Sequence, residues 1–230
     1  MNEQTINQQL AGILKEALNK ISRLNYNSAE EVLRQGLVLD KHNPELLYNL
    51  AVVLLKQKKD DEAEECLKTI INLPFSTVEL LQVKTMLCYS FLNRGKYKEC
   101  ANHLISLVEL APNNVVSLSL LGFYYEKIGH LENAIKTYRT ILTIDRENLN
   151  AHNSFAYLSA VSGHDLNLAL TSARYCITKK PDNPAYCDTA GYIYAKIGET
   201  GLSSKYLKKA HSLKPDSKEI QQHLHELLKI

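Results

Sequence analysis

The sequence predicts an all-α fold of stacked helical hairpins, and three regularities support this prediction. Gly129 lies 34 residues after Gly95 and 34 residues before Gly163. Gly198 follows 35 residues further on. Small residues recur with nearly the same period, and they are Ala29, Ala63, Cys100, Ala134, Ala169 and Ser203. The apolar residues between these markers have helical spacing, so each period holds helices rather than strands.

Residues 115–148 form the clearest unit of this repeat. Its first helix is indicated by apolar and small residues at helical spacing, namely Leu118, Leu121, Gly122 and Tyr125. A turn is expected at Gly129. The second helix follows, with Ala134, Tyr138, Ile141, Leu142 and Ile144 on one face. A hairpin of this size cannot bury its apolar face alone, so it must stack against similar neighbours.

The repeat unit resembles the tetratricopeptide repeat in its period and in the residues that mark it. These residues are Leu121, Gly122, Tyr125, Gly129, Ala134, Tyr138 and the prolines Pro112, Pro181 and Pro215. The chain departs from the family in having no tryptophan. The resemblance implies a right-handed α-solenoid that binds proteins or peptides. Residues 153–198 are also similar to repeats common in bacterial envelope-associated and secretion-associated proteins.

We expect one solenoid domain over residues 1–230, with six hairpins and a capping helix. The expected hairpins cover residues 6–43, 44–75, 76–113, 114–148, 149–183 and 184–217, and the capping helix covers residues 218–230. The first hairpin is degenerate, because its first helix lacks the Leu-Gly pair. Terminal repeats are often atypical, since one of their faces meets water.

Three hairpins depart from the regular spacing. The second has Lys58 where later hairpins have glycine. The third is three residues longer, and Ser76 followed by Glu79 is a capping-box pattern that predicts an added turn on its first helix. The fifth has one extra residue in its turn, where His164 or Asp165 is expected to cap the next helix.

The C-terminal segment is predicted to be an amphipathic helix that covers the apolar end of the last hairpin. Its apolar residues are Ile220, Leu224, Leu227 and Leu228. His223 and His225 lie two residues apart, so on a helix their side chains diverge and cannot share a metal ion. We expect both histidines to face solvent.

The composition is that of an ordinary soluble domain: 45% hydrophobic and 23% charged, with a formal net charge of +2. Such a charge favours neither nucleic acid nor an anionic membrane surface. The most apolar run, residues 46–55, is about half as long as a membrane-spanning helix requires. The N-terminal residues show no apolar leader, so a cytoplasmic location is the default. A chain from which a signal or lipoprotein segment had been trimmed would read the same.

No motif in the chain predicts an enzyme, a metal site or a cofactor. The five cysteines form no C-x-x-C pair, which argues against a zinc site or a disulfide framework. Cys88 and Cys100 replace small residues of the repeat, so we expect them to face each other as reduced core thiols. His164 and Asp165 lack the further ligands of a metal-dependent hydrolase, and the turn at Gly198 lacks phosphate-loop spacing.

One position on the first helix of each hairpin predicts the binding site. It is occupied by Leu18, Val52, Tyr89, Phe123, Tyr157 and Tyr192. In the family that the chain resembles, this side of the helix faces the concave surface. The four aromatics would then form a stripe flanked by Asn93, Lys127, Asn150, Asn153, Asp188 and Lys196. Such a stripe suits a peptide held by apolar anchors, with amides available to its backbone.

Two alternatives to this site remain open. The aromatics can instead pack across the groove onto one another. The chain can also be an accessory subunit that docks a globular enzyme, or an envelope or secretion assembly, through its convex face or edge. Chaperone-tail binding is disfavoured, because the Lys and Asn required one turn apart on a first helix are absent. The residues found there are Tyr48 and Val52, Thr85 and Tyr89, Ser119 and Phe123, and Asn153 and Tyr157.

Overall fold

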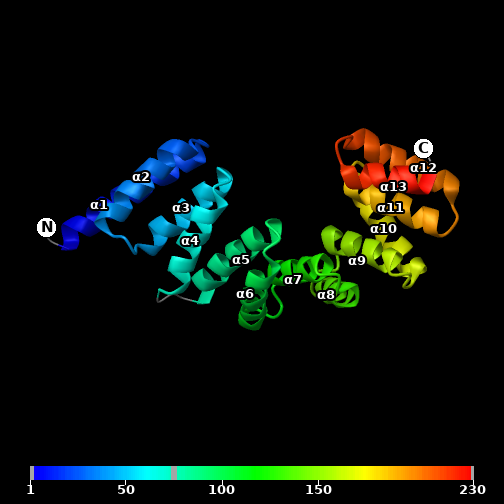
Figure 1. The fold of residues 1–230 in the computed structure, drawn as a ribbon, viewed down its shortest axis with the longest axis horizontal. Coiled ribbons are helices and arrows are strands. Elements are labelled where there is room, and N and C mark those ends of the chain that lie inside the picture. Colours follow the sequence, from blue (N-terminus) through cyan, green and yellow to red (C-terminus); the bar gives the residue numbers. More distant parts are fainter. Residues whose placement is uncertain (1–2, 74–76, 229–230) are drawn as a thin grey trace. The chain divides into compact units, whose positions relative to one another are not determined.

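The structure is a computed structural model that describes residues 3–73 and 77–228. Within these ranges it contains thirteen α-helices and no strand (Figure 1). The chain divides into two compact units, Met1–Pro112 and Asn113–Ile230, and each is described by itself. The all-α class predicted from the sequence is confirmed.

Unit 1 holds three helical hairpins. Its helices are α1 (Glu3–Ser22), α2 (Tyr26–Leu39), α3 (Pro44–Lys56), α4 (Asp60–Ile71), α5 (Thr77–Asn93) and α6 (Tyr97–Leu110). Each odd-numbered helix packs against the helix that follows it, and neighbouring hairpins pack through α2 with α3 and α4 with α5. We call the odd-numbered helices the inner helices.

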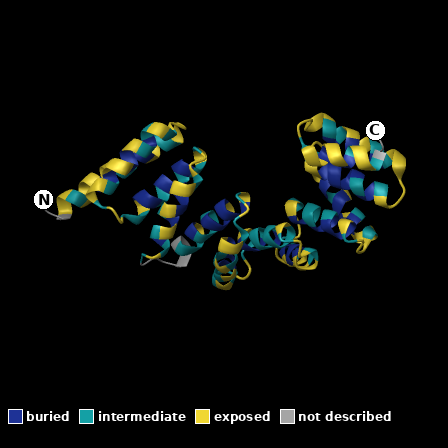
Figure 2. Cartoon of the chain, viewed as in Figure 1, coloured by how far each residue is buried: buried dark blue, intermediate teal, exposed yellow. Residues whose placement is uncertain are grey.

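Unit 2 holds three hairpins and a last single helix. Its helices are α7 (Val115–Lys127), α8 (Leu131–Ile144), α9 (Leu149–Val161), α10 (Leu166–Lys179), α11 (Pro184–Lys196), α12 (Thr200–Leu213) and α13 (Lys218–Leu228). The inner helices of successive hairpins also touch here, because α11 contacts both α9 and α13. Figure 2 shows the buried residues concentrated where helices of one unit face each other.

The turn inside each hairpin contains a residue with a positive φ. These residues are Leu24 (φ 59°), Lys58 (61°), Gly95 (69°), Gly129 (78°), Gly163 (73°) and Gly198 (83°), and the fifth turn contains Asp165 (26°) as well. A side chain makes this conformation unfavourable, and glycine avoids that penalty. Leu24 and Lys58 adopt it nevertheless, so the packing of the hairpin imposes the turn even where the sequence does not favour it.

The small residues of the repeat lie where the two helices of a hairpin approach most closely. Ala134 is completely buried on α8. A Cβ added to Gly122 of α7 would lie 2.8 Å from Cζ of Tyr138, and one added to Gly191 would lie 2.7 Å from Cγ of Leu207. Such approaches leave no room for a larger side chain, as the period of small residues predicts.

Both insertions have the local effect that was expected. Helix α5 has 17 residues where α3, α7, α9 and α11 have 13, so the longer third repeat does add a turn. Ser76, the first residue of the predicted capping box, lies outside the described residues. In the fifth repeat, the carboxylate of Asp165 accepts a hydrogen bond from the backbone N–H of Leu168 at 3.1 Å and caps α10.

Asparagine side chains begin four of the inner helices. Asn43, Asn114, Asn148 and Asn183 each accept a hydrogen bond from a backbone N–H in the first turn of the helix that follows. An N-cap of this kind stabilises a helix by about 1 kcal/mol relative to alanine. The start of each of these inner helices is therefore fixed locally, independently of its packing.

The thiols of Cys88 and Cys100 lie against each other inside the α5–α6 hairpin, as predicted. Both residues are buried, and the thiol of Cys100 lies 3.7 Å from the backbone oxygen of Cys88. The pKa of Cys88 is raised by its contact with Cys100 and by burial. All five cysteines are unpaired thiols.

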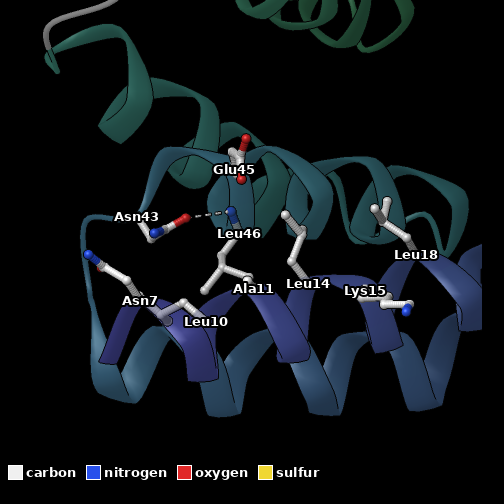
Figure 3. A pocket seen from close by; sticks show the side chains of 9 residues that line it. All are labelled: Asn7, Leu10, Ala11, Leu14, Lys15, Leu18, Asn43, Glu45 and Leu46. Carbon is white, nitrogen blue, oxygen red and sulfur yellow. Dashed lines mark hydrogen bonds between the residues drawn. The ribbon is translucent and has the colours of Figure 1, made fainter. Parts of the chain in front are cut away.

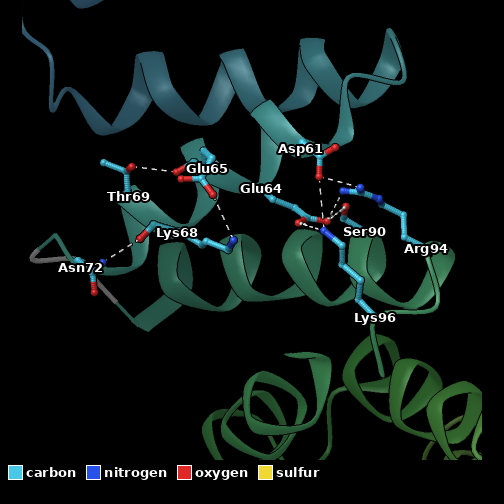
Figure 4. A network of polar contacts seen from close by, with 9 residues as sticks. All are labelled: Asp61, Glu64, Glu65, Lys68, Thr69, Asn72, Ser90, Arg94 and Lys96. Carbon is cyan, nitrogen blue, oxygen red and sulfur yellow. Dashed lines mark hydrogen bonds and ion pairs between the residues drawn. The ribbon is translucent and has the colours of Figure 1, made fainter. Parts of the chain in front are cut away.

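A buried carboxylate joins the second and third hairpins of unit 1 (Figure 4). Glu64 of α4 is only 2% exposed. Its two oxygens accept hydrogen bonds from Ser90 at 3.1 Å, Arg94 at 2.9 Å and Lys96 at 2.7 Å. Asp61 adds a second contact to Arg94, at 2.7 Å. All the donors lie on α5 or directly after it, so the network ties α4 to the next hairpin.

Candidate functional site

Two aromatic residues of the predicted stripe meet in unit 2. Tyr157 of α9 and Tyr192 of α11 have ring centroids 5.4 Å apart in an edge-to-face arrangement, and both rings are partly exposed. Such a pair is worth about 0.5–1.5 kcal/mol beyond the area that it buries. Packing of the stripe aromatics onto one another, one of the two alternatives to a binding stripe, therefore occurs at these two positions.

His223 of α13 completes this cluster. Its ring lies 4.9 Å from that of Tyr192 and 5.7 Å from that of Tyr157. Its Nδ1 is 2.8 Å from Oδ2 of Asp188, and its Nε2 is 3.3 Å from the hydroxyl of Tyr157. The expectation that His223 faces solvent is wrong, because it is only 6% exposed. Helix α13 packs on α11 and α12, which turns this face inward.

Negative charge collects around the cluster. Burial works against a charged His223, but the hydrogen bond and charge of Asp188, with Glu219 and Glu226, raise its pKa above the usual value. Burial raises the pKa of Tyr157 well above its usual value, and the charges of Glu219, Asp188 and Glu126 contribute. Carboxylates from α7, α11 and α13 thus act on one hydroxyl.

The two lysines of the predicted site lie over aromatic rings of the stripe. The Nζ of Lys127 is 4.9 Å from the ring centroid of Phe123, and the Nζ of Lys196 is 5.2 Å from that of Tyr192. Each pair is four residues apart, the spacing that brings helical side chains together. Contacts of this kind contribute about 0.5–1 kcal/mol at exposed positions. The lysines therefore extend the aromatic surface and give it a positive edge.

The predicted amides have different surroundings. The Oδ1 of Asn150 accepts a hydrogen bond from the hydroxyl of Tyr186 at 2.8 Å, so this oxygen already has a partner. The Oδ1 of Asn153 is buried and has no hydrogen-bond partner within the described chain, and the same holds for Oδ1 of Asp188. A buried oxygen left in this condition costs about 1–3 kcal/mol.

Both unpartnered oxygens belong to residues that line one hollow of unit 2. It has a volume of about 210 Å³ and lies among α7, α9, α11 and α13. Its lining includes Glu126, Asn153, Tyr157, Asp188, Lys214 and Glu219. The hollow thus combines one aromatic face with several polar groups.

The remaining stripe residues lie in unit 1, where the inner surface is more open. Tyr89 of α5 is 57% exposed, and Leu18 of α1, at the same repeat position, is 46% exposed. Asn93 is also exposed. Hollows of about 400 and 270 Å³ share Leu14, Leu18 and Glu45 in their linings. Figure 3 shows Leu10, Leu14 and Leu18 in a row along one face of α1 at the larger hollow.

Sequence reasoning missed three residues of the unit 2 site, His223, Glu126 and Glu219. A signal for His223 exists, since it lies 35 residues after Asp188, the step that separates later repeats. Treating α13 as a further inner helix, not only as a cap, would have placed His223 in the same row as Asp188. The described residues contain no cluster of three or more potential metal ligands. No described helix is both long and apolar enough to cross a membrane.

Comparison with known proteins finds a relative of low sequence identity. It is cellulose synthase operon protein C of Pseudomonas fluorescens (strain SBW25), which is 23% identical to the chain over 189 residues. The match covers 77% of the chain but only 14% of that protein, so the chain spans about one seventh of the length of this relative.

Solved structures share the fold at low sequence identity. PilF of Pseudomonas aeruginosa matches with a TM-score of 0.76 and 16% identity, over 96% of this chain and 99% of that one. YrrB, described as a repeat protein with an unusual peptide-binding site, matches with a TM-score of 0.63 and 17% identity, over 84% and 97% of the two chains. Family models described as "Tetratricopeptide repeat" match residues 22–76, 116–148 and 184–217. The chain therefore belongs to the tetratricopeptide repeat family.

Proposed function

We propose that the chain is a non-enzymatic scaffold that binds a segment of a partner protein along its inner helices. The observation that carries this proposal is the surface of unit 2 formed by Phe123, Tyr157 and Tyr192. These three aromatics lie on successive inner helices and remain partly exposed, and Tyr157 also lines the polar hollow. Aromatic side chains are enriched at protein interfaces, because they offer a large contact area for few rotatable bonds.

The contacts among the rings support binding as well as packing. Tyr157 is held by Tyr192 and His223, and Phe123 and Tyr192 carry lysines over their faces. Side chains that are already ordered lose less entropy when a partner binds. The peptide-binding site for which the YrrB structure is named is a property of that protein, and it is consistent with a peptide ligand here.

Selection of random linear peptides on the full chain tests the proposal. We expect enriched peptides with apolar or aromatic anchors. Their affinity for Phe123→Ala should fall by about 2 kcal/mol or more, as at typical aromatic hot spots. Phe123 is the position to change first, because Tyr157 also holds His223 in place.

Tyr175→Ala provides the matched control. Tyr175 is a partly buried aromatic on α10, outside the inner helices, and its ring contacts His152 at 4.8 Å. This variant should bind the selected peptides as the original chain does. Loss of binding in Tyr175→Ala with full binding in Phe123→Ala would move the interface to the outer helices, where a globular partner would dock. Failure to enrich any peptide would contradict the proposal.

A further inference from the structure

The hollow of unit 2 has more acidic groups than its internal contacts account for. Glu126, Asp188 and Glu219 reach it from α7, α11 and α13. Asp188 uses Oδ2 to bind His223, while its Oδ1 is buried and unpartnered. The residue as a whole is 5% exposed. One carboxylate oxygen of a residue that lines the hollow therefore has no donor in the described chain.

Glu126 is only weakly neutralised. Its Oε1 lies 3.6 Å from the Nζ of Lys127, which also lies over Phe123. Burial raises the pKa of Glu126 above its usual value, and the charge of Glu219 adds to this effect. A carboxylate in this condition gains more than an exposed one from an additional positive charge.

The cationic groups nearby do not pair with every acceptor of the residues that line the hollow. Lys214 lies at its rim, is exposed and follows the last residue of α12. His223 is committed to Asp188 on one side and to Tyr157 on the other. Two residues of the lining retain acceptors without donors in the part of the chain that the structure describes, and these acceptors are Oδ1 of Asp188 and Oδ1 of Asn153.

The size of the hollow limits what can enter it. At about 210 Å³ it is smaller than the roughly 300–1,000 Å³ of typical small-molecule sites, so it suits a single side chain. A guanidinium group offers five donors in a planar fork and always carries a positive charge. Its flat face can also stack on an aromatic ring such as Tyr157.

We propose that this hollow receives an arginine side chain of the bound partner segment, with Asp188 and Asn153 accepting its hydrogen bonds and Glu126 and Glu219 supplying negative charge. The proposal rests on the proposed function and adds the chemistry that a ligand must carry. Tyr157 joins the two parts, because its ring belongs to the aromatic surface and its residue lines the hollow.

The test uses the peptides selected on the full chain. We expect the enriched peptides to share an arginine. Replacing that arginine by glutamine should weaken binding to the original chain at least about tenfold, because a buried charge pair loses one partner. The same replacement should change binding by less than about threefold in Asp188→Asn, which lacks the charged acceptor. In Glu126→Gln it should weaken binding less than in the original chain, because part of the negative charge is missing.

Two variants guard against loss of structure. Asp188→Asn disturbs the contact to His223, whereas Glu126→Gln leaves it intact. The matched control is Glu132→Gln, which changes an exposed carboxylate on α8. In this variant the arginine peptide should still bind at least about tenfold more tightly than the glutamine peptide. A peptide with lysine in place of arginine should bind more weakly than the arginine peptide, since ammonium lacks the fork.

The outcomes separate this inference from the proposed function. Enriched peptides without a basic residue would overturn the inference and leave the scaffold function standing. The inference would also be overturned if replacing the arginine by glutamine weakened binding equally in the original chain, in Asp188→Asn and in Glu126→Gln. If no peptide is enriched, the proposed function fails, and the inference fails with it.

Discussion

Side chains at the same repeat position differ in exposure between the two units. In unit 1, Leu18 and Tyr89 leave much of their surface open, and Leu18 lines hollows that include Leu14. In unit 2, Tyr157 and Tyr192 pack on each other and on His223 of α13. The difference shows that a repeat position fixes where a side chain points, while the neighbouring elements decide how much of it remains available.

Removal of α13 should have the largest effect on the difference between the units. Deletion of residues 217–230 removes Ile220 and should therefore expose Cys187 and Ala210, the two residues that it covers. It also removes His223, which packs on Tyr157 and Tyr192. We expect this deletion to cost more stability than any single substitution in either unit, with aggregation or dimerisation, because an apolar repeat end meets water.

The Cys187 thiol reports on this deletion. It is fully buried in the intact chain, and its labelling by a thiol reagent should be slow there and fast in the shortened chain. Cys88 and Cys100 lie in unit 1 and should remain protected in both. A shortened chain that stays monomeric at full stability would show that α13 is not a cap.

A second change tests the close approach of helices in unit 2. Leucine at Gly122 would collide with Tyr138, and leucine at Ala134 would overfill a fully buried position. Each substitution should lower the free energy of unfolding by about 1–3 kcal/mol while helicity persists. Gly12→Ala in unit 1 is the control, because an added Cβ there meets nothing within 4 Å. If thermal unfolding were unchanged in both Gly122→Leu and Ala134→Leu, the helices would not meet at these residues.

Truncation of one stripe tyrosine in each unit should lower stability by different amounts. Tyr157→Ala should cost about 1–2 kcal/mol, since it removes ring contacts and the hydrogen bond to His223. Tyr89→Ala should stay within about 0.5 kcal/mol, because its ring is largely exposed. Chemical denaturation of the two variants measures this, and equal losses would remove the distinction between the units.

The smallest expected effect is a pH dependence. The folded-state pKa of His223 is raised, so its contribution is fully present below the unfolded value near 6.5 and is lost as pH rises through the folded pKa. The stability difference between the original chain and His223→Gln should therefore be larger at pH 6 than at pH 9. The titratable groups that act on His223 are the same in both proteins, and they are Asp188, Glu219, Glu226 and Tyr157.

His42→Gln, at an exposed position in unit 1, is the control for the pH experiment and should show no such trend. A difference that grows toward pH 9 would contradict the role given to Asp188.

Most of the fold follows from local sequence signals. Regular glycine spacing predicts the turns, and the longer step before Cys100 predicts the added turn of α5. The extra residue after Gly163 predicts a cap at His164 or Asp165, and Asp165 provides it. These features depend on a few neighbouring residues. The left-handed turns at Leu24 and Lys58 could not be predicted in this way, because neither residue favours a positive φ. There the packing of the hairpin overrides the conformational preference of the residue.

The site was less predictable, for a physical reason. Tyr157 and Tyr192 could be found because they share a repeat position, and Asp188 because it lies one helical turn before Tyr192. Their contacts with His223 depend on how α13 packs against α11, which is a tertiary matter. The exposure of Tyr89 likewise depends on which side chains lie near it. The repeat position of a residue identifies candidates for a binding site. It cannot distinguish an aromatic ring that packs on its neighbours from one that is exposed.

The ion network around Glu64 has a consequence for how unit 1 opens. If the third hairpin detached from the second, Glu64 would lose Ser90, Arg94 and Lys96 together. Fraying between α4 and α5 would therefore break two ion pairs and a hydrogen bond to one carboxylate in a single step. Amide hydrogens of α4 and α5 should then exchange with solvent at a common rate, as one cooperative group that spans the boundary between two repeats.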